Sequence, residues 1–167
     1  MKRHVRFPDE ACTIWYMEFT EHITTSASRD DAWAALTDVT DWPRWTTSMR
    51  EVRPLGADAI SVGNKFRVTQ PGLPRAVWTV SEVRPGEAWL WSNSSPGMRS
   101  VAFHRLETNP DGTLEIAIGI RLTGLLAGLI GTLITGKTRR YLKLEAAGLK
   151  AASESAAARA ASGSAAG

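Results

Sequence analysis

The sequence lacks several features that would point to a particular class of protein. Its one cysteine, Cys12, excludes an internal disulfide and any metal site built from several cysteines, and it fits a reducing, cytoplasmic setting. The most apolar stretch, residues 122–134, is too short to cross a bilayer and is broken by glycines. No apolar segment follows the basic residues 1–4, so we expect neither a signal peptide nor a transmembrane segment.

Catalytic and cofactor-binding motifs are also missing. There is no nucleophile elbow, no phosphate-binding glycine loop and no pair of histidines at metal-ligand spacing, so the sequence predicts no cofactor and no metal site. The formal net charge is +3, and cations gather between Lys137 and Lys150. Such a group complements the dipole at a helix C-terminus. It is too local and too poor in aromatic residues for a nucleic-acid surface, and we expect no nucleic-acid partner.

The sequence has instead a high content of tryptophan and a clear alternation of apolar and polar residues. Seven tryptophans and 43% hydrophobic residues in a chain of 167 are enough for one domain with a buried core. Alternation over 17–24 predicts a half-buried strand. A short helix over 28–36 is expected next, with a serine N-cap and acidic residues in its first turn.

The pentapeptide Asp41-Trp42-Pro43-Arg44-Trp45 follows this helix. Each indole can bury on the order of 200 Å² of surface. Pro43 disfavours helical geometry in the residue before it, so Trp42 is expected to be extended. We interpret the segment as a rigid aromatic plug that closes one end of a hydrophobic container.

Residues from about 49 onward predict six more strands and a long helix. Short turns such as Asp111-Gly112 require an antiparallel meander. The strands are expected at 49–55, 64–70, 75–84, 88–94, 98–107 and 113–123, and the helix at about 124–153. An antiparallel sheet must cover its apolar face, and only this helix is long enough to do so. A pocket is expected between the two, because a curved sheet and a helix do not match in shape.

The predicted C-terminal helix has an apolar stripe on one side and glycines on the other. Counted at 100° per residue from residue 122, the stripe contains Leu122, Leu125, Leu126, Leu129, Ile130, Leu133 and Ile134. Gly124, Gly128 and Gly131 lie opposite. Because glycine weakens a helix, these three favour either close contact with another backbone or an irregular, kinked start.

Several short motifs occur in a characteristic order and spacing. They are the segment 26–38, Trp42-Pro43-Arg44-Trp45, Trp78-Thr79-Val80-Ser81-Glu82-Val83 with Pro85-Gly86, Asp111-Gly112-Thr113, and Leu-Lys-Ala-Ala-Ser-Glu at 149–154. Over residues 17–154 this order resembles the START-like (SRPBCC) superfamily, in its polyketide cyclase/dehydrase branch. The resemblance implies an α+β helix-grip fold. In that fold a curved antiparallel sheet of about seven strands wraps around a long C-terminal helix, with two short helices after the first strand.

The resemblance also suggests how the chain is organised. We expect residues 1–16 to be an N-terminal extension, 17–153 a START-like ligand-binding domain, and 154–167 a disordered Ala/Ser/Gly tail. The fold hosts lipid carriers, hormone receptors, ring-cyclising enzymes and chaperone cofactors, so fold alone does not choose among these functions.

Five tryptophans are candidates for the aromatic wall of the pocket. They are Trp42, Trp45, Trp78, Trp89 and Trp91. Trp89 and Trp91 share one face of their strand. Two indoles would lie in solvent unless that face points inward or a dimer surface covers it, and the inward pair is favoured.

Two polar residues on the predicted strands could orient a ligand. Glu21 shares its strand face with Phe19 and Ile23, which predicts an inward carboxylate unless a twist or bulge turns it outward. His104 is a pocket residue capable of acid/base chemistry if its face points inward, and otherwise a surface or structural histidine. His22 lies in the outward register and is expected to be solvated.

Two further candidates lie on the long helix. Arg140 falls on the apolar stripe if the helix is unbroken, and it could then pair with Glu21 or with an anionic ligand. Tyr141 could present its hydroxyl at the mouth of the cavity. A kink at Gly136 would remove the argument for Arg140.

These features favour the binding or carriage of a hydrophobic small molecule, such as a lipid, isoprenoid or polyketide. Apolar burial would supply the affinity, and one or two polar groups would fix the orientation. The alternative is a polyketide cyclase or aromatase-like enzyme, although no clear acid/base pair is evident. A third hypothesis is a protein-interaction module, and a homodimer is possible.

Overall fold

The computed structural model describes residues 16–164, in which helices and strands follow the expected order. Every strand begins and ends within two residues of the bounds expected from the alternation. In chain order the elements are β1 (Tyr16–Thr25), α1 (Arg29–Thr37), α2 (Trp42–Trp45), β2 (Glu51–Pro54), β3 (Lys65–Thr69), β4 (Ala76–Arg84), β5 (Ala88–Ser95), β6 (Met98–Thr108), β7 (Leu114–Thr123) and α3 (Ala127–Ser164).

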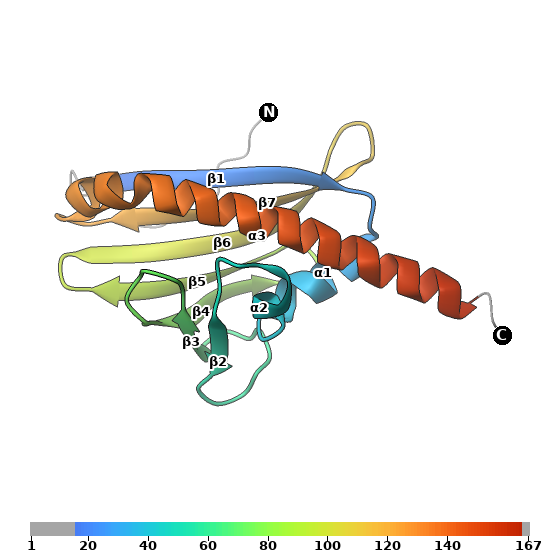
Figure 1. Cartoon of the computed structure of the whole chain (residues 1–167), viewed down its shortest axis with the longest axis horizontal. Helices are drawn as coiled ribbons and strands as arrows, with labels where there is room; N and C mark the ends of the chain where they lie inside the picture. Colours follow the sequence, from blue (N-terminus) through green and yellow to red (C-terminus); the bar gives the residue numbers. More distant parts are fainter. Residues whose placement is uncertain (1–15, 165–167) are drawn as a thin grey trace.

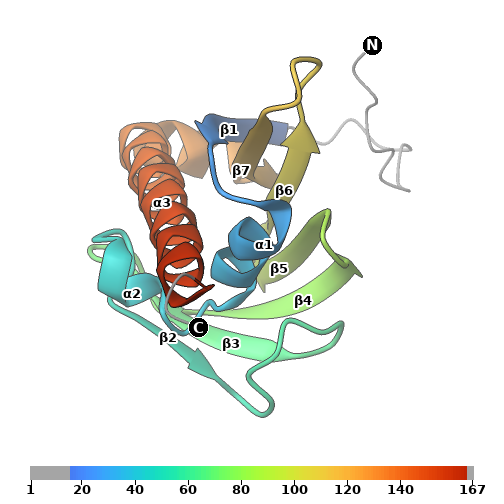
Figure 2. The ribbon, with the colours of Figure 1, turned by 90° about the vertical axis from the view of Figure 1, so that its right-hand side faces the viewer.

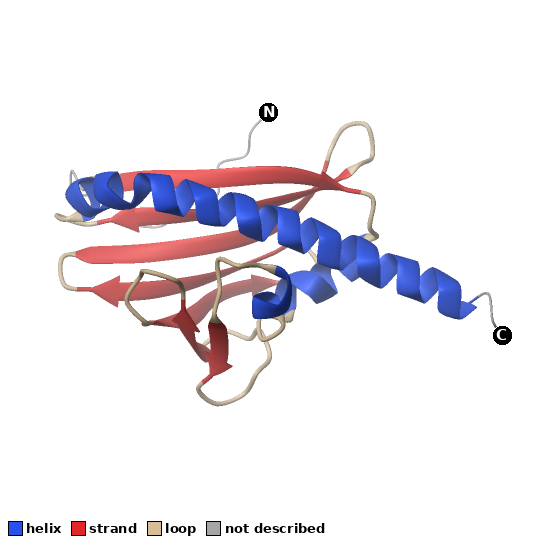
Figure 3. Ribbon diagram, in the orientation of Figure 1, coloured by secondary structure: helices blue, strands red, loops and turns tan. Residues whose placement is uncertain are grey.

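The strands form one antiparallel sheet in the order β1-β7-β6-β5-β4-β3-β2. Figure 1 shows α3 lying across this sheet, and Figure 2, turned by 90°, shows the sheet bending around the helix, with α1 and α2 on the same side. Figure 3, coloured by secondary structure, distinguishes the long helix from the strands that it crosses. The predicted α+β class and helix-grip arrangement are confirmed.

The first short helix, α1, begins as the sequence predicts. Ser28 is the N-cap, and its Oγ accepts a hydrogen bond from the Asp31 backbone N–H at 3.1 Å. Ala32 and Leu36 are buried, as their helical spacing indicates. This capped turn fixes the point at which the chain leaves β1 and crosses to the concave side of the sheet.

The second short helix, α2, corrects the expectation that Trp42 is extended. Residues Trp42–Trp45 form a single helical turn, and the Thr46 N–H donates to the Trp42 carbonyl at 3.0 Å. Pro43 lies in the first turn, where its missing N–H removes no helical hydrogen bond. Burial of the Trp42 indole outweighs the usual preference for an extended residue before proline.

The long helix α3 differs from the prediction at both ends. Gly124 lies in the preceding turn with a positive φ of 122°, and the helix begins at Ala127. This is the irregular start, one of the two explanations for the glycines. Close contact with another backbone, the other explanation, applies at Gly124, where a Cβ would collide with the Gly97 carbonyl, whereas Gly131 lies against the Met17 side chain of β1.

At its C-terminal end α3 continues through Ser164. The predicted helix end at 153 is therefore wrong, and the segment expected to be a disordered tail is helical as far as Ser164. Alanine is the strongest helix former, and it is frequent in this segment. Residues 1–15, nearly all of the expected N-terminal extension, and residues 165–167 lie outside the described residues.

The buried face of α3 is not the apolar stripe predicted from the sequence. The fully buried residues include Ala127, Ala146 and Leu149, whereas Leu129 and Leu133 are 65% and 78% exposed. The prediction counted the helical phase from residue 122, which belongs to β7, and the turn at Gly124 breaks that phase. Within residues 16–164, none of the helices has both the length and the apolarity that a membrane span requires.

Candidate functional site

A cluster of aromatic rings lies on the concave face of the sheet, against α2. Trp42 is at its centre, with its ring centroid 5.7 Å from Trp45, 6.1 Å from Trp89 and 6.0 Å from Trp91. Trp78 joins at the side, 5.4 Å from Trp91. The five tryptophans proposed as a pocket wall therefore come together. Trp89 and Trp91 are buried within the molecule, which agrees with the inward orientation rather than a dimer surface.

His104 belongs to this cluster and faces inward. Its ring stacks on Trp89, with centroids 4.0 Å apart and planes at 17°, and lies 5.2 Å from Trp42. The side chain is only 3% exposed. Burial lowers the pKa of His104 to about 3, because an imidazolium loses its hydration there, although a hydrogen bond with the Trp89 backbone acts in the opposite direction. His104 is therefore neutral at physiological pH.

Three buried nitrogen atoms of this cluster have no hydrogen-bond partner within the described residues. They are Nδ1 of His104, Nε1 of Trp89 and Nε1 of Trp91. An unsatisfied buried polar group costs about 1–3 kcal/mol, so most such groups in proteins are paired. Indole N–H groups are donors only, whereas the imidazole nitrogen can donate or accept. The cluster is thus a buried aromatic environment that contains three polar atoms without a partner.

Glu21 shares a row across the sheet with two members of the cluster. The register pairs Glu21 with Ile118, Ile118 with His104, and His104 with Trp89. Pairing of β1 with β7 is continuous, so no bulge turns Glu21 outward. It is half-buried and has no hydrogen bond or ion pair within residues 16–164. One strand separates Glu21 from His104, which places their backbones about 10 Å apart, too far for a direct acid/base pair.

A second polar site, which the sequence analysis missed, surrounds Glu145 of α3. Ser48 Oγ donates to the buried Glu145 carboxylate at 2.8 Å, and Gln70 Nε2 lies 3.4 Å from the same oxygen. Thr46 Oγ1 and Ser48 Oγ are 2.9 Å apart. Burial raises the pKa of Glu145 to about 7, while the hydrogen bond from Ser48 lowers it. This carboxyl group can hold or release a proton near neutral pH.

The sequence does contain a signal for Glu145. It lies between Leu142 and Leu149 on the buried face of α3, so a helical phase counted from those residues predicts an inward carboxylate. A helical phase counted from residue 122, at the start of the apolar run, predicts a different buried face for α3. The general rule that an inward carboxylate needs partners would then have led to Ser48.

Two hydrogen bonds join α3 to the turn between β3 and β4. Tyr141 donates its hydroxyl to the Pro71 carbonyl, and Lys137 Nζ donates to the Gly72 carbonyl at 2.8 Å. The Tyr141 hydroxyl is therefore engaged by this turn, and its place at the mouth of a cavity stays a prediction. Arg140 is exposed on the outward side of α3 and forms no ion pair with Glu21, which corrects its predicted orientation. His22 is exposed as expected, 2.8 Å from Glu115.

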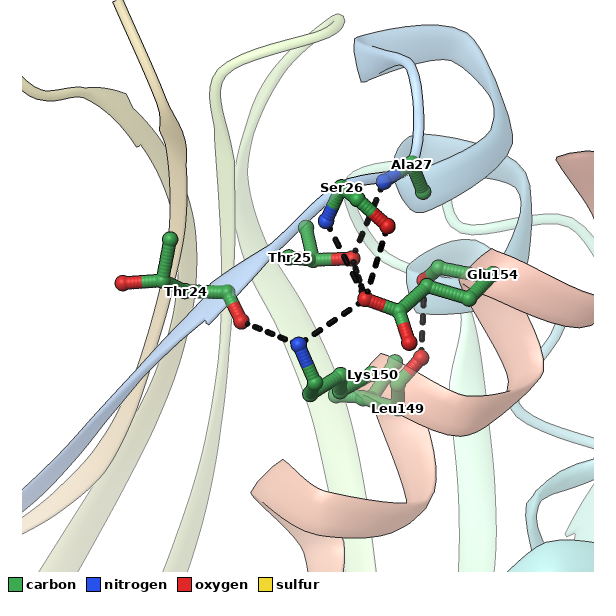
Figure 4. Close-up of polar contacts among 8 residues, drawn as sticks. Thr24, Thr25, Ser26, Ala27, Leu149, Lys150 and Glu154 are labelled. Carbon is green, nitrogen blue, oxygen red and sulfur yellow. Dashed lines mark hydrogen bonds and ion pairs between the residues drawn. The ribbon is translucent and has the colours of Figure 1, made fainter. Parts of the chain in front are cut away.

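Two sets of contacts hold the C-terminal half of α3 against the rest of the molecule. Gly148 allows the helix to approach α2 closely, because a Cβ there would collide with the Trp45 ring and carbonyl. Further along, one Glu154 oxygen accepts from the Ser26 N–H, Ser26 Oγ, Thr25 Oγ1 and Lys150 Nζ, at 2.9–3.1 Å (Figure 4). Lys150 lowers the pKa of Glu154 to about 2, helped by the Ser26 N–H.

A separate open depression of about 540 Å³ lies at the turn between β4 and β5, away from the aromatic cluster. Arg29 of α1 reaches this turn, where it donates to the Gly86 carbonyl at 2.9 Å and the Leu106 carbonyl at 3.1 Å. Both contacts join α1 to the sheet, so we assign Arg29 a structural role. The unpartnered buried nitrogens lie instead in the aromatic cluster.

Comparisons with known proteins agree with this architecture. The chain is similar in structure to hypothetical protein jhp0584 from Helicobacter pylori, with a TM-score of 0.67, 14% identity, and coverage of 92% of this chain and 98% of that chain. It is also similar to truncated norcoclaurine synthase from Thalictrum flavum, with a TM-score of 0.65 and 11% identity. That match covers 85% of this chain and 96% of the synthase chain. The same synthase in complex with dopamine and hydroxybenzaldehyde has a TM-score of 0.64 and 11% identity, and the match covers 89% of this chain and 95% of that chain.

Sequence comparison identifies the family. A search of curated proteins finds no significant match. The family described as polyketide cyclase / dehydrase and lipid transport matches residues 16–154, from the first residue of β1 to the Glu154 contacts in α3. This match covers most of the chain, and the helix-grip fold agrees with it. The chain belongs to the polyketide cyclase / dehydrase and lipid transport family.

Proposed function

We propose that this protein binds a hydrophobic or amphipathic small molecule between the sheet and its covering helices, against Trp89, Trp91 and His104. The observation that carries the proposal is the group of three buried nitrogens without partners on one aromatic surface. A ligand oxygen would accept from the indole N–H groups and remove their desolvation cost. Apolar contact with the rings would supply most of the affinity.

Binding requires Trp42 to move, because its ring covers Trp89, Trp91 and His104. The turn that carries it is only four residues long. Its indole N–H donates to the Ala35 carbonyl at 3.3 Å, which is a long hydrogen bond. Trp42 can therefore leave the cluster without breaking a strand or a long helix, and a ligand ring can replace its contacts.

The first probes follow from the comparisons and from the site. Norcoclaurine synthase has been solved with dopamine and hydroxybenzaldehyde, which supports small aromatic molecules as one class to test. The family description supports polyketide-like compounds and lipids as the others. Each of these classes joins an apolar body to an oxygen acceptor, as the site requires.

The test is an NMR titration that observes the tryptophan indole N–H signals of isotope-labelled protein. Hydroxybenzaldehyde and a fatty acid serve as probes. Binding at the cluster should shift the Trp89 and Trp91 signals and leave that of Trp33, on α1, nearly unchanged. The double variant Trp89→Phe, Trp91→Phe keeps an aromatic ring at each position and removes both donors, so it should bind at least about tenfold more weakly. Trp33→Phe is the matched control, and equal affinity of all three proteins would contradict the proposal.

A cyclase- or dehydratase-like enzyme is the second candidate, and Glu145 is the observation that favours it. Its pKa of about 7 suits proton transfer at neutral pH, and Ser48 and Gln70 hold it in place. Glu145→Gln keeps the size of the side chain and removes the exchangeable carboxyl proton. An enzyme should lose turnover of a polyketide-like substrate in this variant while keeping its affinity for the substrate. A carrier should show no turnover in either protein.

A further inference from the structure

The first turns of α3 present leucines to solvent. Leu125, Leu129 and Leu133 are 91%, 65% and 78% exposed. Leu129 and Leu133, spaced by four residues, lie on one side of the helix, opposite the side on which Ala127 and Leu149 are buried, and Leu125 lies in the turn before the helix. Single exposed leucines are ordinary on protein surfaces, but three exposed leucines so close together in the chain form an apolar patch.

Basic side chains follow the leucines on the same side of the helix. One turn beyond Leu133 an open depression of about 450 Å³ lies over Gly136, and it is lined by Gly136, Arg139, Arg140, Lys143 and Leu144. Arg140 and Lys143 are exposed and have no hydrogen bond or ion pair within residues 16–164. Arg139 leans toward β1, with its guanidinium 6.0 Å from the Phe19 ring centroid.

No negative charge balances these cations on that side of the helix. Between residues 125 and 153 the sequence has one acidic residue, Glu145. Glu145 is buried on the opposite side of α3, against Ser48. We call the outward surface formed by Leu125, Leu129, Leu133, Arg140 and Lys143 the Leu/Arg face; it is apolar at one end and positive at the other.

We propose that the Leu/Arg face docks on the surface of a bilayer that contains anionic phospholipids. The helix would lie in the plane of the interface, with its leucines at the boundary between head groups and acyl chains. Arg140 and Lys143 would reach lipid phosphates and carboxylates, which supply the missing negative charge. From Leu129 to Lys143 the helix rises about 21 Å, so one bilayer surface can contact the whole face.

A second copy of this chain is a poorer occupant. Two parallel Leu/Arg faces would place cation against cation. An antiparallel pair would place the cations of each copy over the leucines of the other, with no carboxylate near them. An anionic lipid surface matches both ends of the face at once. The proposal stands independently of the ligand proposed above, because it uses a different side of α3.

The experiment is co-sedimentation of the full chain with vesicles of phosphatidylcholine alone or of phosphatidylcholine mixed with phosphatidylserine. We expect binding to the mixed vesicles and much weaker binding to the neutral ones, with the difference reduced at high salt. Leu129→Ser with Leu133→Ser should weaken binding at least about tenfold. Arg140→Glu with Lys143→Glu should weaken it at least about 30-fold and remove the preference for phosphatidylserine.

Control variants change exposed residues elsewhere. Val62→Ser removes an apolar side chain that is 66% exposed, and Lys65→Glu reverses an exposed charge on β3. Both should bind like the wild type. Circular dichroism should show that every variant is folded, because the altered side chains are exposed. Equal binding to both vesicle types, no binding, or wild-type binding by the Leu/Arg variants would overturn the proposal. So would a dimer, seen by sedimentation equilibrium, that Leu129→Ser dissociates.

Discussion

The first turns of α3 and the turns after Tyr141 contain leucine and glycine alike, but these residues have different roles. After Tyr141, Leu149 is buried, Gly148 lies in contact with Trp45, and Glu145 and Glu154 accept hydrogen bonds. In the N-terminal half, Leu129 and Leu133 point to solvent. The difference teaches that the position of a residue relative to the sheet, more than its hydrophobicity, decides what it does.

The largest expected contrast is between two leucines of this one helix. Leu149→Ala removes a fully buried side chain and should lower the free energy of unfolding by about 2–5 kcal/mol. Leu133→Ala removes a side chain that is mostly in water and should change it by less than about 0.5 kcal/mol. Urea denaturation of both variants measures the difference. Similar losses would mean that the exposed leucine row is packed in solution.

Glu145 should make stability depend on pH in a defined window. Its pKa is about 7 in the folded protein and ordinarily 4.5, so the folded state holds the proton more tightly. The contribution of this group to the free energy of unfolding is greatest below about pH 4.5. It declines by on the order of 3 kcal/mol as the pH rises to about 7. Glu145→Gln should remove this decline, whereas Glu51→Gln, at an exposed position of β2, should keep it.

The contribution of His104 has the opposite sign and must be separated from that of Glu145. Its pKa is about 3 when folded and ordinarily 6.5, so stability declines as the pH falls below about 6.5. Urea denaturation of wild type and Glu145→Gln at each pH gives a difference that isolates Glu145. A difference that does not vary between about pH 4.5 and 7 would contradict the buried, partly protonated carboxyl group.

Two glycines of α3 offer a matched pair. Gly148→Ala adds a Cβ against the Trp45 ring and carbonyl, and overpacking of this kind costs about 1–3 kcal/mol. Gly136→Ala adds a Cβ in open space and should stabilise the helix by up to about 1 kcal/mol. Thermal unfolding should therefore shift in opposite directions. A shift in the same direction for both variants would argue against close contact between α2 and α3.

The smallest of these effects is expected at Glu154, because its side chain is partly exposed. Glu154→Gln should weaken the contacts with Thr25, Ser26 and Lys150 and lower the thermal midpoint. The folded pKa is about 2 against an ordinary 4.5, so the stabilisation is present above pH 4.5 and is lost as the pH falls toward 2. Lys143→Gln, which removes an exposed charge of the same helix, should leave the midpoint unchanged.

The sheet could be predicted from the sequence because each strand has a local pattern that ends in a turn. Residues 113–123 alternate regularly after Asp111-Gly112, and β7 is found at Leu114–Thr123. Ser28 likewise caps α1 through a neighbour three residues away. These elements depend on interactions between residues close together in the chain, so the local sequence pattern predicts them.

Features that depend on contacts distant in sequence could be predicted only in part. The inward pairing of Trp89 with Trp91 follows from strand parity, but Trp42 over His104 is a contact between segments far apart in the chain. The face of α3 depends on where the helix crosses the sheet after the turn at Gly124. For the same reason a helical phase counted from residue 122 puts Arg140 on the wrong side of the helix and does not identify Glu145 as buried.

The measurement that tests the central claim most directly is native mass spectrometry of freshly purified protein, followed by solvent extraction of any bound compound. The account predicts one small molecule for each chain of the wild type, with an apolar body and an oxygen acceptor. The Trp89→Phe, Trp91→Phe variant should carry much less of it, and Trp33→Phe the wild-type amount. Wild-type protein free of any compound, or full occupancy of the double variant, would contradict a ligand site at these buried indoles.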